Sequence, residues 1–246
     1  MPYTLVRADN PGPMTLEGTN TYLLHGDSGT VVVDPGPADP AHLEAIGVRD
    51  VVAIVLTHTH PDHVDGVPAL AGRFGVDTWA ADPDRVPIPA EPLEEGDYVL
   101  GGVTFTVLAT PGHTADSVCF VTADGVLTGD TILGRGTTVV THPDGDLGRY
   151  LDSLRRLEAL AETAGDRPVL PGHGPELPSL AAAARHYLAH REERLDQVRA
   201  AVAAGDRTPA EVVARVYADV DRALWPAAEQ SVRAQLDYLD SLRERE

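Results

Sequence analysis

The sequence contains no lysine, so all 19 of its basic side chains are arginines. They are outnumbered by 38 acidic residues, which gives a net charge of −19 at pH 7. Most of the excess lies in residues 1–175, where 25 acids face 9 arginines, whereas residues 176–246 hold 13 acids and 10 arginines. Because phosphate backbones bind basic surfaces, nucleic acid is not the expected partner of the first part of the chain.

Cysteine and long apolar runs are also scarce. Cys119 is the single cysteine, which excludes an internal disulfide and fits a reducing compartment. No apolar run approaches the ~18 residues of a membrane span, and the amino terminus has no apolar signal core. We therefore expect a cytoplasmic protein without a membrane partner. Hydrophobic residues make up 43% of the chain, which is enough for a core, while nothing in the sequence indicates an oligomeric state.

The first part of the chain has the pattern of short strands separated by turns. Apolar runs and turn residues predict strands at residues 21–24, 30–33, 51–56, 98–100, 103–108, 119–121, 126–127 and 169–170. Residues 51–56 are apolar throughout, which is typical of a strand buried on both faces. Helical spacing of apolar residues at 64–74 and 147–161 predicts helices that cover the strands. The pattern is mixed α/β and suggests a four-layer αββα sandwich.

From about residue 178 the pattern changes to helices alone. Apolar residues recur at helical spacing from 180 to 202, and Gly205 ends the run. Thr208-Pro209-Ala210-Glu211 is a capping box with proline at the first helical position, which predicts a second helix. Residues 232–242 predict a third. We therefore expect two domains, a sandwich over residues 1–175 and a small helical domain over residues 176–246.

Histidines and aspartates cluster directly after the buried strand, in Thr57-His58-Thr59-His60-Pro61-Asp62-His63. Side chains two apart on an extended segment point the same way, so His58 and His60 can reach one metal ion. Pro61 then forces a turn, which lets Asp62 and His63 face a second metal from the start of the next helix. Neutral imidazoles and carboxylates suit zinc.

Three further ligand-type residues follow predicted strands. These are His113 in Thr-Pro-Gly-His-Thr, Asp130 in Thr-Gly-Asp-Thr and His173 in Leu-Pro-Gly-His-Gly. Each alone is a weak signal, since a single histidine or aspartate is more often a cap or a core residue. Together with the cluster they supply five imidazoles and two carboxylates, enough for two metal ions side by side. We expect two Zn²⁺ ions, with iron or manganese as alternatives.

The order of these motifs resembles the metallo-β-lactamase-fold hydrolase superfamily over roughly the first 175 residues. The resemblance implies the αββα fold, a first metal bound by His58, His60 and His113, and a second bound by Asp62, His63 and His173. It also implies that Asp130 bridges the two metals. Asp34, in Val-Asp-Pro-Gly, matches an aspartate that often contacts a ligand in this superfamily.

Two segments discriminate between branches of that superfamily. The run from Asn10 to Tyr22 and the tail around Tyr187 and the capping box resemble the β-lactamase-like protein branch that includes a mitochondrial endoribonuclease. That branch has a winged-helix-like carboxy-terminal domain, whose β wing we expect to be absent here. Glyoxalase II is the competing branch, and it binds glutathione carboxylates through basic residues of its carboxy-terminal helices. No clear counterpart is evident, because a solvated helix face is the favoured interpretation of the three helical arginines Arg185, Arg191 and Arg194.

The favoured function is a dinuclear zinc hydrolase that uses a metal-bridging hydroxide on a small ester, thioester or lactone. Asp62 and Asp130 are the predicted catalytic residues, and His142 and Tyr150 are candidate pocket residues. A metal-dependent endoribonuclease and a mononuclear iron persulfide dioxygenase are the alternatives. Cys119 lies within a predicted strand, so we expect it to belong to the core rather than to act as a nucleophile.

Overall fold

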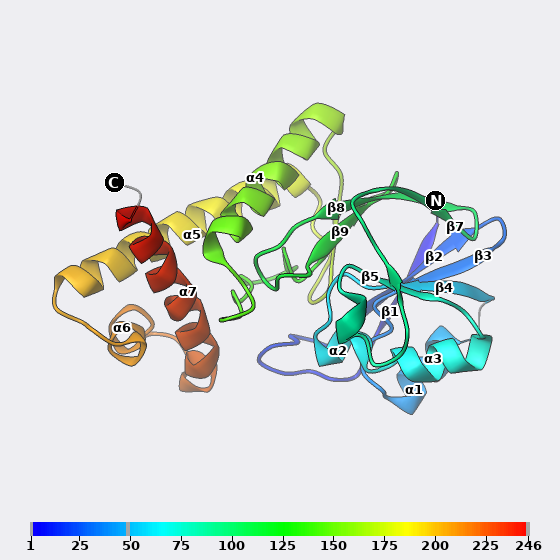
Figure 1. The fold of residues 1–246 in the computed structure, drawn as a ribbon, viewed down its shortest axis with the longest axis horizontal. Coiled ribbons are helices and arrows are strands. Elements are labelled where there is room, and N and C mark those ends of the chain that lie inside the picture. The colour runs from blue at the N-terminus through cyan, green and yellow to red at the C-terminus, as the bar shows by residue number, and fades with distance from the viewer. Residues whose placement is uncertain (1, 48–49, 245–246) are drawn as a thin grey trace.

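The computed structural model describes residues 2–47 and 50–244, and its first part is built on two facing sheets (Figure 1). The first sheet has the strand order β1-β2-β3-β4-β5-β6. Its strands are β1 (Tyr3–Arg7), β2 (Asn20–Gly26), β3 (Gly29–Val33), β4 (Val51–Val55), β5 (Thr78–Ala80) and β6 (Glu91–Pro92). The first three strands are antiparallel and the rest join in parallel, so the sheet is mixed.

The second sheet has the order β11-β10-β9-β8-β7. Its strands are β7 (Gly96–Leu100), β8 (Val103–Ala109), β9 (Val118–Val121), β10 (Val126–Gly129) and β11 (Val169–Pro171). Only the β10–β11 pair is parallel. The predicted strands at residues 119–121 and 126–127 form an antiparallel hairpin in which Val126 pairs with Val121.

Helices cover the outer face of each sheet and give the predicted αββα order. On the first sheet lie α1 (Pro40–Ile46), α2 (Pro61–Val64) and α3 (Val67–Phe74), and on the second lies α4 (Leu147–Ala164). The apolar strand β4 shows why, since Ala53 and Val55 enter the core between the sheets while Ile54 packs under the outer helices. The helix predicted over residues 64–74 is two helices, because the chain turns at Asp65 and Gly66 between α2 and α3.

After β11 the described residues form helices and no further strand, so the β wing is absent from this part of the structure. The elements are α5 (Leu180–Ala203), α6 (Pro209–Val216), the 3₁₀ turn η2 (Arg222–Leu224) and α7 (Trp225–Arg243). A short 3₁₀ turn, η1 (Pro83–Arg85), lies earlier in the chain. The capping box is confirmed, since Thr208 and Glu211 each bond to the other's backbone amide.

The carboxy-terminal helices share a core with the second sheet rather than hanging free. α5 lies along α4 (Figure 1), and one continuous apolar cluster joins Leu151 and Leu154 of α4 to Leu195 and Val198 of α5 and Val232 of α7. The boundary at residue 175 stays a prediction, because no physical gap marks it. None of the described helices is both long and apolar enough to cross a membrane.

Candidate metal centre

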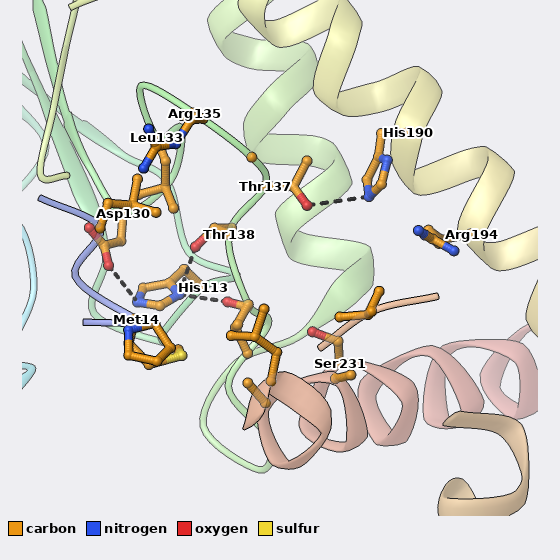
Figure 2. Close-up of a pocket in the computed structure, with 18 of the residues that line it drawn as sticks. Met14, His113, Asp130, Leu133, Arg135, Thr137, Thr138, His190, Arg194 and Ser231 are labelled. Atoms are coloured by element: carbon orange, nitrogen blue, oxygen red, sulfur yellow. Dashed lines mark hydrogen bonds and ion pairs between the residues drawn. The ribbon is translucent and has the colours of Figure 1, made fainter. Parts of the chain in front are cut away.

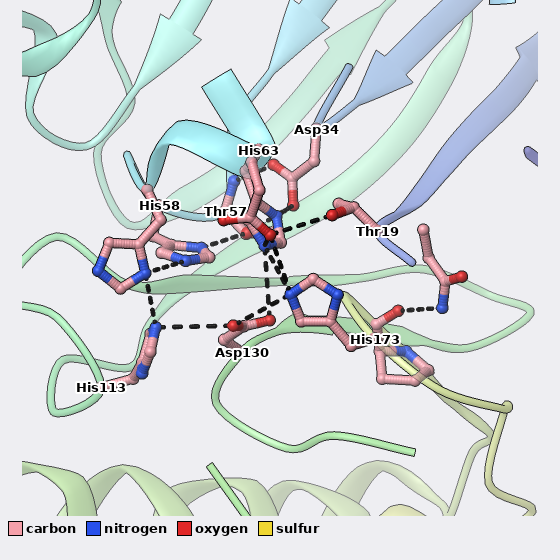
Figure 3. Close-up of polar contacts among 12 residues, drawn as sticks. Thr19, Asp34, Thr57, His58, His63, His113, Asp130 and His173 are labelled. Carbon is pink, nitrogen blue, oxygen red and sulfur yellow. Dashed lines mark hydrogen bonds and ion pairs between the residues drawn. The ribbon is translucent and has the colours of Figure 1, made fainter. Parts of the chain in front are cut away.

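The structure brings the seven predicted ligands together at one edge of the sandwich (Figure 3). Each lies at or just beyond the carboxyl end of a strand. His58 and His60 follow β4, Asp62 and His63 begin α2, and His113, Asp130 and His173 follow β8, β10 and β11. Because these strand ends meet at the same edge, residues more than a hundred positions apart become neighbours.

Three imidazoles and one carboxylate form the first half of the centre. His60 Nδ1 lies 3.1 Å from His58 Nε2 and 3.0 Å from His113 Nε2. Asp130 Oδ2 lies 3.7 Å from His113 Nε2. One ligand atom from each of the four residues lies within 4.8 Å of all the others. The ring nitrogens therefore converge on a common point.

Asp62, His63 and His173 form the second half. His173 Nε2 lies 3.2 Å from Asp62 Oδ2 and 3.3 Å from His63 Nε2. Asp130 faces this group too, with Oδ1 3.6 Å from His63 Nε2 and Oδ2 3.4 Å from His173 Nε2. Asp130 is thus the residue that lies between the two halves.

The spacing of these atoms fits metal binding. Tetrahedral zinc with bonds of ~2.0–2.1 Å places its ligand atoms roughly 3.3 Å apart, close to the nitrogen–nitrogen distances here. Asp130 Oδ1 is buried without a hydrogen-bond partner, as expected of an oxygen reserved for a cation. Gly172 leaves room, since a Cβ there would lie 2.6 Å from that oxygen and 2.8 Å from His63 Cε1. The residues present therefore fit two ions.

Asp34 orients His63, a residue of the second half, through a hydrogen bond to its ring. Its carboxylate accepts hydrogen bonds from the backbone amide of Thr57 at 2.8 Å, the hydroxyl of Thr57 at 2.7 Å and Nδ1 of His63 at 2.9 Å. A donated Nδ1–H leaves the lone pair of His63 Nε2 directed at the centre. Asp34 holds this position with a left-handed φ of 51°, which aspartate tolerates better than most residues.

Thr19 is a contact that the sequence pattern did not single out. Its hydroxyl donates to Asp62 Oδ2 at 3.0 Å and lies 3.0 Å from Nδ2 of Asn10, which donates to it. The Asn10 carboxamide also accepts from the Thr19 amide, so the loop before β2 is fixed to the centre. The signal was present in the segment from Asn10 to Tyr22, but nothing local reveals that its threonine faces Asp62.

His113 is oriented by a segment that we call the strap, residues 137–140. Its Nδ1 donates to the carbonyl of Val139 at 2.6 Å and lies 3.2 Å from the hydroxyl of Thr138. The donation fixes the tautomer, so that Nε2 faces the centre.

Both long carboxy-terminal helices hold the strap in place. From α5, Arg191 donates to the carbonyl of Thr138, and His190 Nε2 lies 3.3 Å from the hydroxyl of Thr137. From α7, Ser231 accepts from the amide of Val140 at 3.2 Å. The helices therefore contact a candidate ligand through one intervening segment.

Burial and neighbouring charges shift the pKa values of the histidines in opposite directions in the two halves of the centre. Burial, together with the neighbouring imidazoles, lowers the pKa of His58 strongly and that of His60 to about 4. Burial also disfavours charge on His173, but Asp130 and Asp62 outweigh it and raise its pKa to about 11. The pKa of His63 is raised in the same way. Protons in the second half therefore balance carboxylates that a metal cation would otherwise neutralise.

A cavity of about 290 Å³ opens on His113 and Asp130. Figure 2 shows that it extends from the centre towards the carboxy-terminal helices. Its walls combine the loop before β2, the segment after Asp130, and residues of α5 and α7. They are mainly apolar and include Met14, Leu16, Leu133, Val139, Val220 and Leu224.

The two predicted pocket residues lie elsewhere. Tyr150 is fully buried outside the lining of this cavity, where its hydroxyl donates to the carbonyl of Thr131 at 2.7 Å. His142 lies 3.0 Å from Asp237 and lines a separate polar cleft between α4 and α7. Tyr150 instead packs closely against Gly112, the residue before His113, since a Cβ on Gly112 would lie 2.3 Å from the Cα of Tyr150.

The three helical arginines do not share one solvated face. Arg185 is exposed and pairs with Glu158 and Glu162 of α4. Arg191, in contrast, is only 3% exposed, and its guanidinium stacks over the ring of Tyr150. The interpretation as a solvated face is therefore wrong for Arg191, because helix α5 is covered on that side by the strap.

Comparison with known proteins identifies relatives along the whole chain. The Beta-lactamase-like protein 2 homolog of Caenorhabditis elegans is 33% identical over 96% of this chain and 83% of its own length. The structure of a Beta-lactamase domain protein from Burkholderia ambifaria superposes with a TM-score of 0.84 at 26% identity, over 98% of this chain and 86% of that one. A protein named TTHA1623, solved in a di-iron-bound form, gives a TM-score of 0.61 at 31% identity over 74% and 97% of the two chains.

Two family models match separate segments. The Beta-lactamase associated winged helix domain matches residues 208–242, which comprise α6, η2 and most of α7. The model of the Metallo-beta-lactamase superfamily matches residues 14–173, which contain all seven candidate ligands. With its αββα sandwich and helical carboxy-terminal domain, the chain belongs to the metallo-β-lactamase superfamily and groups there with the β-lactamase-like protein 2 homologues.

Proposed function

We propose that the protein is a dinuclear, zinc-dependent hydrolase of small esters, thioesters or lactones. The observation that carries this proposal is the cavity that opens directly on His113 and Asp130. At about 290 Å³ it lies near the lower end of the ~300–1,000 Å³ range of small-molecule sites. Its apolar walls suit an acyl group, and its inner end meets the candidate ligands.

The proposed roles follow from the contacts of each side chain. His58, His60 and His113 would hold one ion, Asp62, His63 and His173 the other, and Asp130 both. Two bound ions supply Lewis acidity and lower the pKa of water towards neutrality. Asp34 and the strap keep His63 and His113 in the orientation that binding needs, so little rearrangement accompanies loading.

A metal-dependent endoribonuclease is the second candidate, and the winged-helix match over residues 208–242 favours it. The charge of the chain opposes it. Arginines that could contact phosphates on α6 and α7 are engaged, since Arg215 pairs with Asp206, Arg233 with Glu229 and Arg243 with Asp240. Single-stranded RNA therefore belongs in any substrate screen beside the esters.

Metal content is the first test. Elemental mass spectrometry on protein purified without added metal is expected to give close to two zinc ions per chain. Two ions of manganese or iron would change the metal but keep the dinuclear centre. About one iron per chain, with oxygen uptake on a persulfide, would replace the hydrolase by the dioxygenase alternative.

Substrate class is the second test. Metal-loaded protein is screened against thioesters, lactones and single-stranded RNA, with chelator-stripped and re-metallated samples as the matched control. We expect turnover of a thioester or lactone that disappears on stripping and returns with zinc. Turnover of RNA alone would overturn the proposal in favour of the nuclease.

A further inference from the structure

The cavity beside the metal centre ends in a region of unusual charge. Figure 2 places His113 and Asp130 at one end, and His190 and Arg194 of α5 at the other. Among the described residues that line it, Asp130 is the sole carboxylate, and it belongs to the metal centre. Arg135, Arg191 and Arg194 also line it. A chain of net charge −19 thus presents guanidinium groups to the inside of its cavity.

Two of these guanidinium groups have no carboxylate partner in the described part of the chain. Arg135 is paired with Glu17 at 2.6 Å, so its charge is balanced. Arg191 is 3% exposed, its guanidinium donates to the backbone carbonyl of Thr138 and stacks over Tyr150, and its buried Nε has no hydrogen-bond partner among the described residues. Buried arginines are normally paired with a carboxylate, but no carboxylate of the described residues pairs with this guanidinium.

Arg194 is the more accessible of the two. It stacks over the ring of Tyr217, with its central carbon 4.8 Å from the ring centroid. Nη1 donates to Gln197 at 2.8 Å and to the carbonyl of Val216 at 3.2 Å. These contacts fix the plane of the guanidinium while Nε and Nη2 remain without an acceptor among the described residues. A fixed planar fork with free donors is the geometry that binds a carboxylate in bidentate fashion.

His190 does not add to the charge at neutral pH. Burial, reinforced by Arg191 and Arg194, lowers its pKa to about 4. The positive potential at this end of the cavity therefore comes from arginine, which stays charged at every working pH.

We infer that the substrate carries a carboxylate on a short apolar acyl group, and that Arg194 binds this carboxylate at the end of the cavity opposite His113. The inference rests on the proposed hydrolase, whose reacting carbonyl lies at the metal centre. The apolar walls between Leu133 and Val220 lower the local dielectric and strengthen the ion pair. The arrangement selects acids of limited length, because the two ends of the cavity are fixed.

The experiment compares two matched series on metal-loaded protein. One contains N-acetylcysteamine thioesters of pentanoic to octanoic acids, and the other contains the mono-thioesters of the corresponding pentanedioic to octanedioic acids. The quantity measured is the ratio of kcat/KM for the charged and neutral members of equal length. Binding of free hexanedioate and hexanoate is measured in parallel by calorimetry, which needs no turnover.

We expect the wild-type ratio to reach about 10- to 100-fold at one chain length, as a charged hydrogen-bonded pair supplies. Arg194→Gln should bring the ratio close to one, and Arg194→Lys should keep part of it. Arg185→Gln is the matched control, because this arginine lies on the same helix and pairs outside the cavity. It should retain the full ratio.

The outcomes separate the inference from the proposed function. Hydrolysis of both series without preference, or a preference that survives Arg194→Gln, overturns the inference and leaves the hydrolase standing. No hydrolysis of any thioester, with hexanedioate binding that Arg194→Gln removes, supports the carboxylate site and rejects the thioester substrate. Cleavage of single-stranded RNA with a KM raised by Arg194→Gln assigns the arginine to phosphate and overturns the inference.

Discussion

Residues 1–175 and residues 176–246 contribute different things to the same centre. The first region carries all seven candidate ligands, and its charge balance is −16. The described residues of the second contribute no candidate ligand, and its charge is nearly balanced at −3. Its helices instead wall the cavity and hold the strap behind His113. The candidate ligands and part of the cavity wall therefore come from separate segments of the chain that meet only after folding.

The largest difference between the two regions is expected when a histidine of each is replaced by alanine. His113→Ala removes a ligand of the first region and should lower zinc content from two ions per chain towards one and turnover by more than about 100-fold, since even losing a partner of a ligand costs ~10–100-fold. His186→Ala, on the exposed face of α5, should leave both unchanged. Metal analysis and steady-state rates on both variants decide the matter. Full activity in His113→Ala would end the dinuclear hypothesis.

Leucine-to-alanine substitutions test whether the two regions unfold together. Leu195 of α5 and Leu70 of α3 are both buried, and each replacement should cost about 2–5 kcal/mol of unfolding free energy. Because α4 and α5 share one core, we expect a single transition in both variants. The check is urea unfolding followed by helix circular dichroism and by zinc release. Two separated transitions in Leu195→Ala would show that the helices are an independent unit.

A smaller effect on zinc binding is expected for substitutions in α7 that loosen the strap behind His113. Ser231→Ala leaves the amide of Val140 without its acceptor, which costs about 1–3 kcal/mol and loosens the strap. We expect weaker zinc binding, measured by competition with a chelating dye, and recovery in Ser231→Thr. Ser241→Ala on the same helix is the control, since its hydroxyl donates to the carbonyl of Tyr238 within that helix. Equal zinc affinity in both alanine variants would contradict a role of the strap.

The smallest effect is expected at Cys119. The thiol is buried 3.3 Å from the hydroxyl of Thr110, and burial raises its pKa to about 11, so it stays protonated. Cys119→Ala should keep turnover within about twofold and lower stability slightly. Iodoacetamide should likewise leave the native enzyme active. Inactivation by either change would bring the thiol into the mechanism.

Much of the fold was predictable because strong local signals coincide with it. The apolar run at residues 51–56 is typical of a strand buried on both faces, and Thr208 with Glu211 forms a capping box that marks a helix start. The short strands β5 and β6 were missed, since strands of three and two residues carry almost no periodicity. The break between α2 and α3 was missed because both halves keep the same apolar spacing.

The candidate ligands of the site were easier to predict from the sequence than the residues that support them. All seven predicted ligands converge, because ligand chemistry is visible in residue type and order. Their supports are less visible, since Val139 acts through a backbone carbonyl and Thr19 through a hydroxyl that any threonine carries. Tyr150 shows the converse, because its sequence position suggests the pocket while its hydroxyl is committed to the backbone of Thr131.

The strap separates His113 from the helices that form part of the cavity wall. It contacts His113 through the carbonyl of Val139, an atom that every amino acid possesses, and through the hydroxyl of Thr138, while the carboxy-terminal helices contribute further side chains to the cavity. Substitutions at cavity-lining positions of these helices that do not bond to the strap, such as Arg194 and Ala227, can therefore reshape the cavity while the ligand geometry is preserved. The helices are therefore the part of the molecule in which the shape of the cavity can be redesigned while the candidate ligands are kept.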